Sequence, residues 1–135
     1  MKGRFTWAEI LEGKHLIGLT TPTRQEPMTL QEYQELAGRT LQKHRRPTDA
    51  AANMAMGLAG ESGELVDLMK KVLFHGHPFE LETMTLELGD VLWYLAGLCT
   101  VHGMSLEDVA RRNVEKLKAR YPEGFTQKDS LSRDN

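Results

Sequence analysis

Apolar residues recur at helical spacing through most of the chain, and the alternation typical of β-strands is nearly absent. The clearest stripe steps along the chain by four and three residues in turn. Its members are Met54, Leu58, Glu61, Leu65, Leu68 and Val72. A second stripe of the same kind consists of Met84, Glu87, Val91 and Tyr94. This is the spacing of helix faces that pack into a core, so the pattern predicts an all-α, four-helix bundle-type domain.

Capping and turn residues delimit four predicted helices, over about 30–44, 48–74, 79–102 and 106–120. Thr29 is placed to cap the first helix, with Glu32 completing a capping box, and Ser105 is placed to cap the fourth. Residues 1–28 form an N-terminal arm in which Thr6 is in position to cap one short helix. Residues 29–126 form the helical domain, and residues 127–135 form a polar tail.

Two pairs of acids interrupt the apolar stripes. Glu61 and Glu64 form one pair, and Glu87 and Asp90 form the other, each spaced i and i+3 on a predicted helix. Residues three apart face nearly the same side, so two antiparallel helices would direct four carboxylates at one place. Unpaired acids in an apolar seam are costly, and Mg²⁺ is a hard cation that prefers oxygen ligands. The alternative is that these acids pair with lysines on solvated faces.

Composition limits the classes of partner. The chain has 135 residues, enough for one domain, and its formal net charge of −2 gives no general attraction to nucleic acid or anionic membranes. The apolar run 91–99 is too short to span a bilayer, and no signal peptide is recognisable. The single Cys99 excludes an internal disulfide. We therefore expect a cytoplasmic protein with no membrane and no nucleic acid polymer as partner.

The third predicted helix is apolar nearly all round from Val91 to Cys99 and includes Trp93 and Tyr94. A single chain has too few helices to cover this belt, so we expect a homodimer or homotetramer with Trp93 at the subunit contact. In that assembly the fourth helix of one chain would approach the acids of another. A monomeric bundle is the alternative.

Three segments carry a resemblance to a known family. GLAGESGELVDLMKK, ELGDVLWYLAGLC and SLEDVARRNVEKLKARYPEGF resemble the MazG-like nucleoside-triphosphate pyrophosphohydrolases, all-α enzymes related to dimeric dUTPases and dCTP pyrophosphatases. The likeness covers about residues 29–126 and includes the family pattern ExxE, a gap, then ExxD. It implies Mg²⁺-dependent cleavage of a nucleoside triphosphate to the monophosphate and pyrophosphate, with Mn²⁺ as a substitute. The implied metal ligands are Glu61, Glu64, Glu87 and Asp90, of which Glu61 and Glu64 are the implied catalytic residues.

The resemblance and the spacing together suggest substrate contacts. Tyr94 lies one turn beyond Asp90 and by similarity would touch the sugar. Asn113, Lys116 and Arg120 share one stripe of the fourth helix. The amide of Asn113 can bond a phosphate or ribose oxygen, and Lys116 and Arg120 would meet the pyrophosphate. The alternatives are a packed core tyrosine and a solvated basic face. Candidates for reading the base, without known placement, are Trp7, Tyr33, His44 and Asn53.

The function predicted from the sequence is a house-cleaning or pool-setting hydrolase of deoxynucleotides or non-canonical nucleotides. One alternative is a phosphoribosyl-ATP pyrophosphatase-like enzyme, although the N-terminal arm and the RYPxGF ending look less like that branch. The other is a non-catalytic helical oligomer that binds nucleotides. The presence of all four acids disfavours that alternative, because a scaffold has no reason to bury them.

Overall fold

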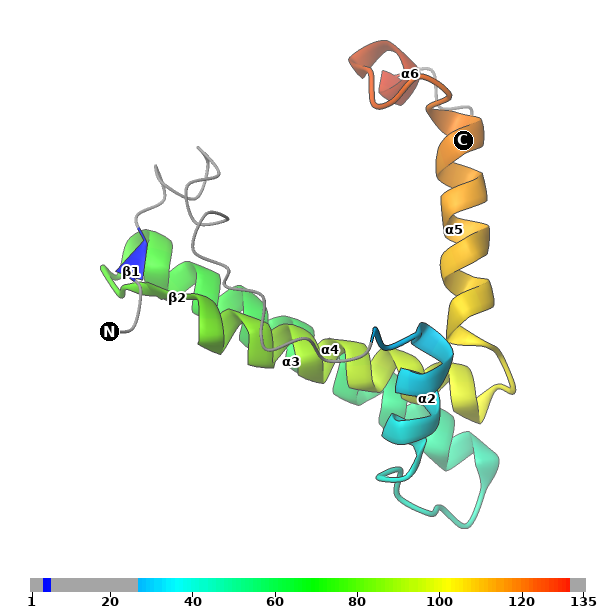
Figure 1. The fold of residues 1–135 in the computed structure, drawn as a ribbon. Coiled ribbons are helices and arrows are strands. Elements are labelled where there is room, and N and C mark those ends of the chain that lie inside the picture. The colour runs from blue at the N-terminus through cyan, green and yellow to red at the C-terminus, as the bar shows by residue number, and fades with distance from the viewer. Residues whose placement is uncertain (1–3, 6–26, 132–135) are drawn as a thin grey trace.

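The computed structural model describes residues 4–5 and 27–131, and this part of the chain is almost entirely helical (Figure 1). The helices are α2 (Leu30–Gly38), α3 (Pro47–Phe74), α4 (Leu81–Val101), α5 (Leu106–Arg120) and α6 (Gln127–Leu131). Two short strands, β1 (Arg4–Phe5) and β2 (Phe79–Glu80), complete the elements. The predicted all-α class is confirmed.

The long helices α3 and α4 form an antiparallel pair that is the body of the molecule (Figure 1). Their contact is the predicted pair of stripes, and Met54 at one end of the α3 stripe is buried. Gly97 of α4 lies opposite, where a Cβ would collide with the Met54 thioether. Small residues against large ones let the two helices approach closely, which brings side chains from both helices within reach of each other.

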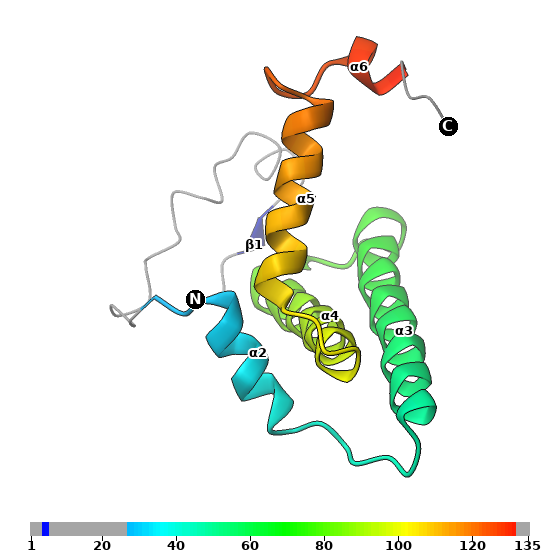
Figure 2. The same cartoon turned by 90° about the vertical axis from the view of Figure 1, so that its right-hand side faces the viewer.

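Helix α2 crosses α4 at the end of the pair from which α5 departs (Figures 1 and 2). The buried residues at this junction come from three helices and form one cluster. They are Ala37, Ala96, Cys99 and Leu106. Tyr33, Leu92 and Trp93 pack against the cluster. The core therefore sits where α2, α4 and the first turn of α5 meet.

Within one chain, Trp93 is partly buried, and its expected place at a subunit contact stays a prediction. Trp93 packs on the core cluster of its own chain, and its indole Nε1 donates a hydrogen bond to Thr40 Oγ1 at 2.9 Å. The ring also meets Tyr94 edge-on, with centroids 4.8 Å apart. The segment after α2 therefore covers part of the α4 belt, while Leu88 and Leu95 of α4 stay exposed.

The predicted caps are confirmed at two helix starts. The Thr29 hydroxyl accepts from the Glu32 backbone N–H at 3.1 Å, and the Glu32 carboxylate accepts from the Thr29 N–H at 2.8 Å. Ser105 Oγ accepts from the Asp108 N–H at 3.2 Å. Gly103, with φ of 65°, ends α4 as expected, because its backbone lies in the left-handed region that glycine adopts without strain.

The end of the first helix was predicted wrongly. The sequence favoured helix to about His44, but α2 ends at Gly38. Thr40 Oγ1 donates to the Ala37 carbonyl at 2.8 Å and accepts from Trp93, so the chain turns here instead of continuing. The other three predicted helices agree with α3, α4 and α5 to within two residues at each end.

Two findings concern the chain ends. β1 pairs antiparallel with β2, with Phe5 opposite Phe79, although neither strand was predicted from the sequence. The predicted tail contains α6. The short helix predicted near Thr6 lies outside the described residues.

Among the described residues, α4 is the one helix long and apolar enough, by length and composition, to cross a membrane. The core helix of a soluble protein passes the same test. Glu87 and Asp90 lie near the middle of α4, where each carboxylate would be costly in hydrocarbon.

Candidate functional site

Three carboxylates meet on the facing surfaces of α3 and α4. They belong to Glu61, Glu87 and Asp90, and one oxygen from each lies within 4.8 Å of the others. The antiparallel pairing explains the meeting, because the acids interrupt the same stripes that pack the two helices together. Glu61 and Glu87 are half-buried, and Asp90 is exposed.

The donor set fits a hard divalent cation. All three groups offer carboxylate oxygen, the ligand that Mg²⁺ and Mn²⁺ prefer. Two oxygens on opposite sides of one Mg²⁺ are about 4.2 Å apart, twice the Mg–O distance. At most one pair of three ligand oxygens can lie opposite, and adjacent oxygens are about 3.0 Å apart. The three oxygens, separated by up to 4.8 Å, would therefore have to move closer by side-chain rotation to bind one ion, with water at the remaining positions.

The raised pKa of Glu61 also favours a cation site. Burial raises the pKa of its carboxyl, and the neighbouring charges of Glu64, Asp90 and Glu87 raise it further. Like charges held this close oppose one another's ionisation. A cation between them would remove that repulsion, so the site as built favours binding of positive charge.

Glu64 takes a different position from the other three acids. It is exposed and lies in an adjoining pocket instead of in the three-carboxylate group. The pocket continues along the groove between α3 and α4, and Glu87 lines it too. Its other lining residues are Gly60, Gly63, Asp67, Leu68, Lys71 and Thr83. Glu64 therefore faces the space next to the carboxylate group, where a bound ligand could extend.

Lys71 is the positively charged residue among those that line this pocket. Its Nζ lies 2.7 Å from Asp67 Oδ2, and Lys70 pairs with the other oxygen of Asp67. These hydrogen bonds lower the pKa of Asp67 to about 2 and, together with the charge of Glu64, raise the pKa of Lys71. Lys71 follows Glu64 by seven residues, a spacing that places both side chains on one helix face and can be read from the sequence.

Tyr94 is fixed by its contact with α3. Its ring lies against Gly57, where any Cβ would overlap the ring carbons. Gly57 precedes Glu61 by one turn, and Tyr94 follows Asp90 by one turn, so the ring borders the acids on both helices. The tyrosine packs as a core residue and also flanks the candidate site.

Tyr33 is a second aromatic residue near the acids, contributed by α2. Burial raises the pKa of its phenol, and the charge of Asp90 raises it further. Two further candidates for reading a base lie together. Asn53 Nδ2 of α3 is 3.5 Å from His44 Nε2 in the segment between α2 and α3. Trp7, the fourth candidate for reading a base, lies outside the described residues.

The predicted stripe on α5 is not brought to the acids within one chain. Asn113, Lys116 and Arg120 are exposed, and α5 rises away from the α3–α4 pair at the end where α4 finishes (Figure 2). The acids lie nearer the middle of that pair. Any contact between this stripe and the acids would therefore have to come from a second chain.

Comparison with known proteins places the chain in a family. The MazG nucleotide pyrophosphohydrolase domain matches residues 49–125, a range that contains all four acids and the whole of α5. The Gene 37 protein of Mycobacterium phage L5 is 36% identical over 78 residues, covering 55% of this chain and 68% of the phage protein. No solved structure matches. With its paired acids on facing helices, the chain belongs to the MazG nucleotide pyrophosphohydrolase domain family.

Proposed function

We propose that the protein hydrolyses nucleoside triphosphates to monophosphates and pyrophosphate, acting on deoxynucleotides or non-canonical nucleotides. The observation that carries the proposal is the group of three carboxylate oxygens within 4.8 Å, from Glu61, Glu87 and Asp90. Such a group binds cations, and a triphosphate is a polyanion that reaches an acidic site together with them. Mg²⁺, for which Mn²⁺ substitutes, would neutralise the phosphate charge and polarise the bond to be broken.

The residues around the three-carboxylate group have separate roles in the proposed reaction. A water molecule attacks the α-phosphorus, the bond to the oxygen bridging α and β breaks, and pyrophosphate leaves. Glu61, the half-buried acid, orients the water and accepts its proton. Glu64 faces the adjoining pocket, where it would hold a metal ion that neutralises the departing phosphates. Tyr94 borders the acids and packs against the sugar.

The direct test is a panel of canonical, deoxy- and modified nucleoside triphosphates, with phosphoribosyl-ATP as one member. We expect hydrolysis that needs Mg²⁺ or Mn²⁺ and stops on addition of EDTA. Phosphorus NMR of the products should show monophosphate and pyrophosphate. Orthophosphate as the first product would contradict cleavage between α and β. Turnover of phosphoribosyl-ATP alone would replace the proposed substrate class with the biosynthetic one.

We also propose that the protein works as a homodimer or homotetramer. Large apolar side chains remain exposed on the long helices, including Val66 at 66%, Phe74 at 78% and Leu86 at 64%. Val114 and Leu117 are exposed on α5 as well. Soluble monomers seldom leave this much apolar surface in water. A second copy would cover these faces and is the source from which Lys116 and Arg120 would reach an acidic site.

Light scattering should give a mass of at least two chains for the wild type. Val66→Glu places a charge on an exposed apolar face and is expected to lower that mass towards one chain, with activity falling in parallel. Glu82→Gln, at an exposed polar position of α4, is the control and should leave the mass unchanged. A fully active wild-type monomer at micromolar concentration would refute the proposal.

A further inference from the structure

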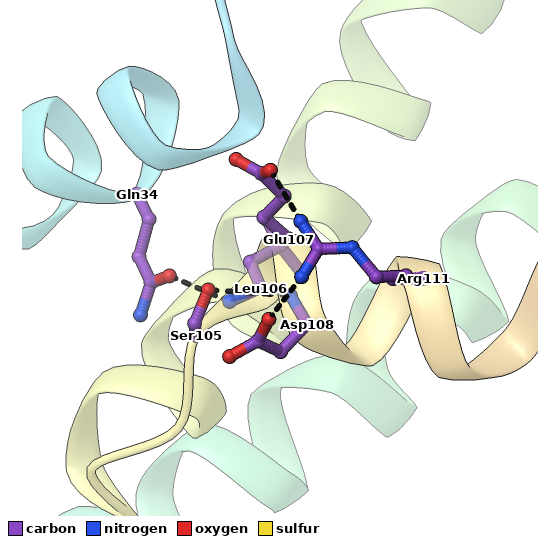
Figure 3. Close-up of polar contacts among 6 residues, drawn as sticks. All are labelled: Gln34, Ser105, Leu106, Glu107, Asp108 and Arg111. Atoms are coloured by element: carbon purple, nitrogen blue, oxygen red, sulfur yellow. Dashed lines mark hydrogen bonds and ion pairs between the residues drawn. The ribbon is translucent and has the colours of Figure 1, made fainter.

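One side chain joins three segments at the start of α5. Gln34 of α2 accepts a hydrogen bond from the Leu106 backbone N–H at 2.7 Å (Figure 3). Its amide nitrogen donates to the Met104 carbonyl at 2.9 Å and to Thr100 Oγ1 at 3.2 Å. The amide thus links α2 to the last turn of α4, to the connecting turn and to the first turn of α5.

This link is central to how α5 is held. Leu106, at 4% exposed, is the buried residue of α5 and lies in the core cluster. Arg111 forms its ion pairs with Glu107 and Asp108 of the same helix, so these pairs do not tie α5 to the rest of the chain (Figure 3). Beyond the first turn, α5 rises away from the other helices (Figure 1). Within one chain, its direction is therefore set at its base.

A helix fixed at one end converts a small change of angle into a large displacement at the other. From Leu106 to Arg120 is about 21 Å at 1.5 Å per residue. A tilt of about 10° at the base would move Arg120 by about 4 Å, more than the length of a charge-assisted hydrogen bond.

We propose that Gln34 is a positioning residue for the substrate-binding stripe Asn113, Lys116 and Arg120. By bonding both the Met104 carbonyl and the Leu106 N–H at the α4–α5 turn, Gln34 fixes the angle at which α5 presents these side chains. The inference rests on the proposed function, including the homo-oligomer in which the stripe reaches the acids of a second chain. The contacts of Gln34 themselves do not depend on that role.

Two variants separate the parts of this contact. Gln34→Leu removes the acceptor and both donors, and Gln34→Glu keeps an acceptor for the Leu106 N–H but loses the donors. Gln31→Leu is the matched control, because the hydrogen bond of Gln31 within the described part of the chain is local, to Glu35 one turn along α2. In Gln34→Leu, kcat/KM for the triphosphate should fall about 10- to 100-fold, mainly through KM, as expected for misplaced binding groups. Gln34→Glu should fall less, and Gln31→Leu should match the wild type.

A double-variant comparison distinguishes positioning from a general structural role. If Gln34 acts through the stripe, Gln34→Leu should cause little further loss in a Lys116→Ala/Arg120→Ala background, because the groups it positions are gone. The Mg²⁺ affinity of the apo-protein should be unchanged in Gln34→Leu, since the acids lie on α3 and α4. Fully additive losses, or an equal loss of Mg²⁺ affinity, would overturn the positioning role.

Amide hydrogen exchange tests the link without any assay of activity. Gln34→Leu should speed exchange at the Leu106 N–H and through the first turn of α5, whereas Gln31→Leu should not. If the wild type hydrolyses no triphosphate, the proposed function fails while faster exchange still supports the control of α5 by Gln34. Unchanged exchange at Leu106 would overturn that control even in an active enzyme.

Discussion

Glu61→Gln is expected to reduce nucleoside triphosphate hydrolysis by about 100- to 1,000-fold, the loss seen when one group that stabilises a charged transition state is removed. The substitution is nearly isosteric but removes one charge from the group that Glu61 forms with Glu87 and Asp90. The fold should survive, because burial and the neighbouring acids already raise the pKa of Glu61 and so disfavour its ionised form. In EDTA the variant should melt no lower than the wild type, and Mg²⁺ should raise its melting temperature less.

The control for Glu61→Gln is Glu115→Gln, which neutralises an exposed glutamate of α5. This variant should keep full activity and the full stabilisation by Mg²⁺. A Glu61→Gln protein that hydrolyses triphosphates at the wild-type rate would remove Glu61 from the site. A large loss of stability in EDTA would instead indicate that Glu61 is a partner in a structural ion pair.

Gly57→Ala is expected to destabilise the protein by about 1–3 kcal/mol, the usual cost of overpacking a tight contact. The new Cβ would overlap the ring of Tyr94, so either the ring must rotate away or α3 and α4 must separate. Either change disturbs the acids one turn along each helix, and activity should fall as well. Thermal and urea unfolding measure the first effect, and the triphosphate assay measures the second.

Gly89→Ala is a matched control on the facing helix. Among the described residues, no atom outside the local helix lies within 4 Å of the Cβ position at Gly89, so the variant should gain the helix propensity of alanine, about 1 kcal/mol. Replacing Tyr94 with leucine in the Gly57→Ala background should recover part of the lost stability. A Gly57→Ala protein as stable as Gly89→Ala would show that the ring yields without cost.

Much of the fold was predictable because its signals are local. Thr29 and Ser105 cap helix starts through hydrogen bonds to residues only three positions further along the chain. The stripes containing Glu61 and Glu87 predict which faces meet, because helix spacing alone decides which residues share a side. The meeting of these two acids with Asp90 followed from the antiparallel arrangement of consecutive long helices.

The features that the sequence did not predict depend on distant partners. The end of α2 at Gly38 is secured by Thr40, whose hydroxyl bonds an indole 53 residues away, and no local pattern contains that contact. Glu64 shares a helix side with Glu61, yet only Glu61 belongs to the three-carboxylate group, and Glu64 lines the adjoining pocket. An apolar helix such as α4 does not reveal whether α2 or a second chain covers Trp93.

The core cluster gives the protein an internal chemical reporter. Cys99 is the only cysteine of the chain and is 2% exposed, at the junction of α2, α4 and α5. Burial raises the pKa of its thiol, so the reactive thiolate is scarce while the junction stays closed. The rate at which a thiol reagent modifies Cys99 under native conditions therefore measures how often this junction opens, without any added label.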